Sequence, residues 1–345
     1  MNRTDCSTGC FPDDAFSSWR ELCRCLDSDP LRGWIFRGLA RYDFHSSSSL
    51  ERLLIREGMP TSQWISAEKL AVEHFKGLVK KLKVSEMVQT LPADDDTLGW
   101  MSLMQHYGAP TRLIDWTKSR YVACWFAYAN AGLGFDSALW LLNADFCRSI
   151  YGRRLTQGEQ LWVPPREKCR SGDGVRSAST DAFEQRVKDE NGLIQHIIKT
   201  RSIWPLPIPI VDPDDRMKKQ EGCFVCLGVL GHDPPILSYL LEPGKYPEAN
   251  GRVFRPTSFY CENGQTEIGP GHPPLTERPC DPQDYIIKIR LRHEWRNEAM
   301  QSLTEMGITA DNLFPGLDGV GRSTELFIRN QMWSDASMSI PSSDC

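Results

Sequence analysis

The sequence lacks any apolar run of the roughly 18 to 20 residues that a helix needs to cross a bilayer, so no membrane association is expected. It also lacks an excess of either charge: 40 lysines and arginines stand against 45 acidic residues, a net charge of −5. A strongly basic nucleic-acid-binding protein is therefore not expected, although a local basic cleft is compatible with this balance. The first residues lack the apolar core of a secretory signal, which favours a cytoplasmic location.

Several common catalytic motifs are also absent. None of GxxxxGK[ST], GxGxxG, HExxH or GxSxG occurs, so the usual signatures of P-loop NTPases, Rossmann enzymes, zincins and serine hydrolases are missing. The twelve cysteines are scattered, and only Cys223 and Cys226 form a C-x-x-C pair, inside an apolar run. Because no second pair follows at zinc-finger spacing, we expect reduced, mostly buried thiols and no metal site.

The periodicity of the apolar residues predicts helices and strands in an irregular order. Strands are expected over residues 33–39, 137–142, 222–230 and 285–291, and helices over residues 15–26, 67–82, 121–131 and 296–306. The proline-rich segment 204–215 is expected to be extended, and residues 92–97 form an acidic turn. This order predicts an α+β fold with a mixed or antiparallel sheet core flanked by helices, rather than a doubly wound sheet.

The densest group of chemically versatile side chains lies in residues 103–120. It combines His106, Asp115, two arginines, two threonines and two aromatic residues with glycine and proline. This composition is unlike that of a core strand, so we interpret the stretch as functional. Asp115 or Thr117 is expected to cap the helix that follows, whose N-terminus is suited to bind an anion.

Four motifs, in order, resemble the FRG domain family. They are Trp34-Ile35-Phe36-Arg37-Gly38, the stretch HYGAPTRLIDWT at 106–117, the stretch RMKKQEGCF at 216–224 and the stretch LFPGLDG at 313–319. Together they cover about residues 30–322. We therefore expect an N-terminal arm at 1–28, an FRG domain at 29–325 with an insertion near 150–200, and a C-terminal tail at 326–345.

The layout of FRG domains is similar to that of ADP-ribosyltransferases, in which an arginine on the first strand, followed by glycine, holds NAD. The resemblance thus implies an ADP-ribosyltransferase-like fold with NAD as substrate, bound by Arg37 and Gly38. The further cofactor-binding candidates are Tyr107, Thr111, Arg112, Trp116 and Thr117. Of these, the two aromatic residues are candidates to stack on an adenine or nicotinamide ring.

The catalytic carboxylate is not fixed by the third motif. Its matched position is Gln220 rather than a glutamate, and the adjacent Glu221 points to the opposite face of an extended chain. Asp115 is an alternative source of the negative charge that stabilises an oxocarbenium-like centre, and His106 is a candidate general base. The candidate catalytic residues are thus Asp115, Gln220, His106 and Glu221.

Three functions stay open at this point. The favoured one is an enzyme that cleaves the nicotinamide–ribose bond of NAD and transfers ADP-ribose to a nucleic acid, nucleotide or protein, in the toxin or phage-defence setting that the resemblance suggests. The alternative is a non-catalytic module that senses a nucleotide or a nucleic-acid end, which the missing glutamate favours. The third is a metal-independent nuclease or hydrolase using His106 and Asp115, since the chain shows no acidic metal-ligand cluster.

Overall fold

The computed structural model describes residues 15–27, 31, 33–82, 91–148, 191–195, 197–199, 205–210, 215–231, 235–241, 260–262, 265–267 and 285–338. Most of the expected insertion near 150–200, and the first half of the expected N-terminal arm, lie outside these residues. In the described part of the chain, no helix combines the length and the apolar character needed to cross a membrane.

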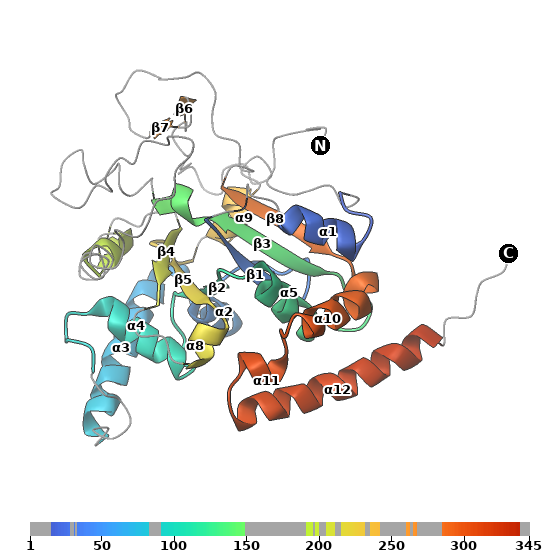
Figure 1. Ribbon diagram of the computed structural model, residues 1–345. Coiled ribbons are helices and arrows are strands. Elements are labelled where there is room, and N and C mark those ends of the chain that lie inside the picture. Colours follow the sequence, from blue (N-terminus) through green and yellow to red (C-terminus); the bar gives the residue numbers. More distant parts are fainter. Residues whose placement is uncertain are drawn as a thin grey trace, which may run out of the picture.

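Six strands form one antiparallel sheet in the order β4-β5-β2-β1-β3-β8 (Figure 1). They are β1 (Trp34–Leu39), β2 (Ile114–Thr117), β3 (Ser137–Asn143), β4 (Leu206–Pro209), β5 (Gly222–Cys226) and β8 (Ile286–Leu291). The whole of β1 pairs with β3, whereas β1 and β2 share only the pair Phe36 and Thr117. The two halves of the sheet therefore separate beyond that pair. The short strands β6 (Tyr260–Glu262) and β7 (Gln265–Glu267) form a sheet of their own.

Helices cover both faces of the six-stranded sheet, which confirms the expected α+β fold. They are α1 (Trp19–Leu26), α2 (Ser49–Arg56), α3 (Trp64–Lys81), α4 (Thr97–His106), α5 (Arg120–Ala129), α8 (Asp215–Lys219), α9 (Ile236–Leu241), α10 (Arg296–Glu305), α11 (Ala310–Leu313) and α12 (Leu317–Met338). Buried residues of α1, α5 and α10 share one apolar core with Phe36 of β1. Buried residues of α4 and α9 share a second core with Ile35. The alternation along β1 thus assigns its neighbouring residues to opposite cores.

Helix α5 lies directly against β1. A Cβ atom on Gly38 would stand 1.9 Å from the carbonyl oxygen of Ala123, so only glycine permits this distance between helix and strand. The side chain of Ser119 caps α5 by accepting a hydrogen bond from the N–H of Val122 at 3.4 Å. The prediction that Asp115 or Thr117 caps this helix is therefore wrong, because both residues lie in β2.

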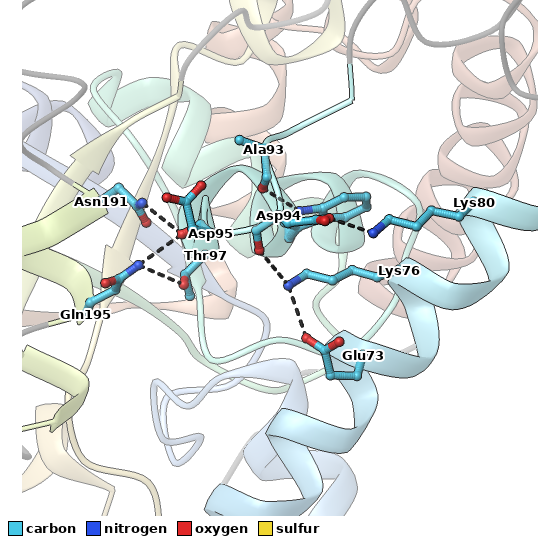
Figure 2. Close-up of polar contacts among 10 residues, drawn as sticks. Glu73, Lys76, Lys80, Ala93, Asp94, Asp95, Thr97, Asn191 and Gln195 are labelled. Carbon is cyan, nitrogen blue, oxygen red and sulfur yellow. Dashed lines mark hydrogen bonds and ion pairs between the residues drawn. The ribbon is translucent and has the colours of Figure 1, made fainter.

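The acidic turn at 92–97 has a structural role (Figure 2). The Lys80 ammonium contacts the Asp94 carboxylate at 2.6 Å and so ties α3 to the turn. The side-chain amides of Asn191 and Gln195 donate to the backbone carbonyl of Asp95 at 3.1 and 3.0 Å. The turn thus joins α3 and the helical residues 191–195 to the start of α4.

Several predicted elements need correction. Residues 114–117 form strand β2, although their polar composition argued against a core strand. A short strand between β1 and β5 can carry polar side chains where one of its faces borders a cleft. The apolar periodicity that predicted the helix over residues 67–82 also implies a buried apolar face, but most of it is exposed. Leu70 and Leu78 of α3 and Leu82 just after it are 71%, 47% and 64% accessible. Helices α2, α4, α8, α9, α11 and α12 were not predicted.

Candidate functional site

A cleft of about 290 Å³ opens where β1 and β2 separate. Residues of β1, β2, α4, α5, α8 and β5 line it. The sequence-predicted residues among them are Arg37, Gly38, His106, Asp115, Trp116, Thr117 and Gln220. The cleft therefore brings together residues from the first three sequence motifs, which lie up to about 180 positions apart in the chain.

Arg37 carries a positive charge in this cleft without a carboxylate partner among the described residues. Its Nη1 donates to the backbone carbonyl of Asp115, and its buried Nε has no hydrogen-bond partner. Burial is the main cause that lowers the pKa of Arg37 to about 10; the charge of Asp115 opposes this effect and that of Arg52 adds to it. A guanidinium in this position gains stability when an anion enters the cleft.

Asp115 supplies the only carboxylate among the described residues that line the cleft. It is the exposed residue of β2. Gln105, at the end of α4, donates from Nε2 to both carboxylate oxygens at 3.0 and 3.1 Å. The carboxylate is thus held in one orientation by a neutral donor.

Gln220 and Glu221 have different surroundings. The buried side-chain amide of Gln220 donates to the carbonyl of Leu313 at 3.0 Å. Glu221 is exposed, has a φ of 46° and does not line the cleft. The third motif therefore brings an amide to the cleft wall, and this amide already has a backbone partner.

Arg112 lies outside the cleft lining. It is fully buried in an ion pair with Glu68, and its Nη1 donates to the carbonyls of Leu227 and Gly228 at 2.9 and 3.2 Å. Burial disfavours its charge, but the hydrogen bonds and the charge of Glu68 outweigh that effect and raise the pKa of Arg112. Its donors serve the core, so we assign it no part in cofactor binding.

Two threonines of the second motif are also occupied by the protein itself. Thr117 donates from Oγ1 to the carbonyl of Gln220 at 2.7 Å and accepts from the N–H of Ser119 at 3.0 Å. Thr111 is 2% exposed and does not line the cleft; its Oγ1 donates to Oε1 of Gln105. Both side chains fix the shape of the site, and neither presents a free hydroxyl to it.

The two aromatic candidates for ring stacking, Tyr107 and Trp116, differ in their position relative to the cleft. Tyr107 is 54% exposed and lies outside the lining, in edge contact with the ring of His106 at 4.7 Å. Trp116 lines the cleft but is mostly buried in the core. His106 is exposed at the cleft wall, so it is accessible to a bound molecule.

The sequence interpretation missed parts of the wall. Gln105, Phe126 and Asn130 line the cleft without having been assigned a role in it. Phe126 packs edge-on against Phe314 at 6.0 Å, which brings the fourth motif next to α5. The signal for Phe126 was available, because its helical period places it beside the residues that face β1. Gln105 stands directly before His106 and had no pattern of its own.

Residues 32–133 match the family model of the FRG domain. The matched segment contains the first two sequence motifs. It runs from β1 to the end of α5 and contains Arg37, Gln105, His106 and Asp115.

No curated protein and no solved structure matches the chain. Within the described ranges, no group of three or more His, Cys, Asp or Glu side chains is arranged to hold a metal ion. The function must therefore be argued from the geometry of the cleft.

Proposed function

We propose that the cleft binds NAD and that the protein is an ADP-ribosyltransferase-like enzyme. The observation that carries this proposal is Arg37, a half-buried guanidinium that faces a cleft and has no carboxylate partner among the described residues. A charge of this kind is costly unless an anion compensates it. Arginine suits a diphosphate because its planar donors bind two oxygens at once.

The residues that line the rest of the cleft are suited to hold the nicotinamide ribose of NAD. The described cleft, about 290 Å³, is just below the range of roughly 300 to 1,000 Å³ for small-molecule sites, so it would hold part of a dinucleotide. Phe126 offers an aromatic surface for a planar ring. Asp115 offers a single negative charge on the side of the cleft opposite Gly38.

The chemistry follows from these positions. The bond between the nicotinamide nitrogen and ribose C1′ breaks, and its electron pair leaves with neutral nicotinamide. The resulting oxocarbenium-like centre is stabilised by the carboxylate of Asp115. A nucleophile of a nucleic acid, nucleotide or protein then bonds to C1′, and its proton passes to His106 or to water. The diphosphate stays with Arg37 throughout, so binding and chemistry use different residues.

A second candidate is a module that binds the nucleotide without consuming it. The engaged amide of Gln220 favours this candidate, because the third motif then supplies no second carboxylate to the reaction. The two functions share the Arg37 site and differ only in turnover.

The test is release of nicotinamide from NAD, measured by mass spectrometry. We expect release by the wild type and at least a roughly hundredfold loss in Asp115→Asn, the range that electrostatic catalytic groups contribute. Arg37→Ala should lose at least roughly tenfold in release at NAD concentrations below saturation, because it weakens binding of the diphosphate. Arg56→Ala, on the exposed face of α2, is the matched control and keeps wild-type release. Binding of NAD without release would favour the sensing module, and neither binding nor release would overturn both.

A further inference from the structure

Thr111 is joined to Asp115 through one intervening side chain. The Thr111 hydroxyl donates to Oε1 of Gln105, and Nε2 of the same amide donates to Asp115 Oδ1 and Oδ2 at 3.0 and 3.1 Å. The three side chains come from α4, β2 and the loop before β2. A buried residue outside the cleft thus contacts the amide that holds the cleft carboxylate.

Only one arrangement of hydrogens satisfies the series of hydrogen bonds from Thr111 through Gln105 to Asp115. An ionised carboxylate can only accept, so Gln105 must present its NH₂ group to Asp115 and its carbonyl oxygen to Thr111. The hydroxyl of Thr111 must then donate. Its oxygen in turn accepts the backbone N–H of Leu113 at 3.2 Å, so its other polar contact is also defined.

The backbone of Thr111 is itself fixed. Its N–H donates to Oγ of Ser49 at 3.1 Å, and its carbonyl accepts from Ser49 Oγ at 3.2 Å and from the N–H of Leu50 at 3.1 Å. Ser49 begins α2, whose start is held by a capping box between Ser48 and Glu51. The hydroxyl of Thr111 is therefore presented from a rigid support.

We propose that Thr111 is a positioning residue that acts through Gln105 to keep the carboxylate of Asp115 oriented in the cleft. The catalytic part of this inference rests on the proposed function, in which Asp115 stabilises the reacting centre. Without the donor on Thr111, the carbonyl oxygen of Gln105 loses its partner, and the amide is held only by its two bonds to Asp115. The two side chains can then move together, and the carboxylate is no longer tied to the rigid support.

The orientation is tested without any turnover. The side-chain amide protons of Gln105 are followed by NMR in the wild type, in Thr111→Val, which is nearly isosteric but has no hydroxyl, and in Thr111→Ser, which keeps it. We expect slow exchange with solvent in the wild type and Thr111→Ser, and loss of this protection in Thr111→Val. Unchanged protection in Thr111→Val would overturn the proposal.

The effect on catalysis is tested by the kinetics of nicotinamide release. We expect kcat to fall roughly ten- to a hundredfold in Thr111→Val and in Gln105→Met, with little change in KM, because misplacement of a reacting group by about 1 Å has that cost. Thr111→Ser keeps kcat. The double variant, Thr111→Val with Gln105→Met, should be no slower than Gln105→Met alone, because both substitutions interrupt the same series of hydrogen bonds.

The outcomes separate the two proposals. Additive losses in the double variant, or equal losses in Thr111→Ser and Thr111→Val, would overturn the role of Thr111 while leaving the proposed function intact. If the wild type released no nicotinamide, the proposed function would fail, and the Gln105 resonances alone would decide whether Thr111 orients the cleft. If Thr111→Val does not fold, Gln105→Met still tests the proposal, because Gln105 is only half-buried and its substitution should disturb the core less.

Discussion

The guanidinium of Arg112 and the carboxylate of Glu68 form an ion pair in the core, where the two side chains are 0% and 7% exposed. The pair joins α3 to the loop that precedes β2, and the same guanidinium satisfies the carbonyls of Leu227 and Gly228 beyond the end of β5. An arginine in the most distinctive sequence motif thus supports the fold behind the cleft.

Glu68→Gln removes the negative partner and leaves the charge of Arg112 uncompensated. We expect it to lower the free energy of unfolding by about 3 to 5 kcal/mol, as measured by urea denaturation. The matched control is Glu57→Gln, which removes the partner of Arg56 at the surface and should cost less than about 1 kcal/mol. Equal effects of the two substitutions would contradict a structural role for the buried pair.

Gly38→Ala tests the close contact between β1 and α5. Because the new Cβ would meet the carbonyl oxygen of Ala123, backbone must move, and we expect a loss of more than about 2 kcal/mol of stability or failure to fold. Gly77→Ala is the control: its Cβ meets nothing within 4 Å in α3, so it should stabilise the protein by roughly 0.5 to 1 kcal/mol. Thermal denaturation of both variants provides the comparison, and a Gly38→Ala protein of wild-type stability would contradict this packing.

The alternation of residues 33–39 predicted strand β1, because alternation along a strand is a local property. The sequence also singled out Asp115 and Gln220, which line the cleft. It could not distinguish Arg112 from Arg37, since the partner of Arg112 lies 44 positions away on α3 and appears only when the chain is folded. For the same reason Thr111 resembled a ligand-binding residue until its bond to Gln105 was known.

Helix α3 shows a different limit of sequence patterns. A helical apolar period predicts a buried face, yet Leu70 and Leu78 are exposed. The helix buries Trp64, Glu68 and Val79, and only Val79 belongs to the predicted face. Burial of a glutamate is specified by its distant arginine partner. The periodicity of apolar residues does not reveal that a glutamate is buried against a distant arginine.

Asp136 should make stability depend on pH. Burial alone would raise its pKa, but hydrogen bonds from the backbone and side chain of His293 and from Arg290 outweigh burial and lower the pKa. A carboxyl with a lowered folded-state pKa contributes stability above its unfolded value of roughly 3.9, and this contribution is lost as the pH falls through the folded pKa.

We therefore expect Asp136→Asn to destabilise the protein by about 1 kcal/mol at pH 7, a modest value because the group is partly exposed. The difference from the wild type should shrink below about pH 4. Urea denaturation at neutral and acid pH measures it. A difference that is independent of pH would contradict the assignment.

Gln220→Glu tests whether the third motif is structural. Glutamate would turn a carboxylate toward the carbonyl of Leu313, which can only accept, so we expect a loss of roughly 1 to 3 kcal/mol of stability and no gain in nicotinamide release. Gln220→Met, which removes the donor without adding a charge, is the control and should cost less. Faster release by Gln220→Glu would instead show that this position serves as the catalytic acid of the site.

Calorimetric titration with NAD tests whether Arg37 forms the anion-binding site of the cleft. We expect the wild type to bind NAD and Arg37→Ala to lose at least roughly tenfold in affinity, because a charge-assisted bond to a phosphate contributes about 1.5 to 3 kcal/mol. Arg56→Ala should bind as the wild type does. Equal affinity of Arg37→Ala and wild type, or no binding by either, would mean that Arg37 does not form an NAD site.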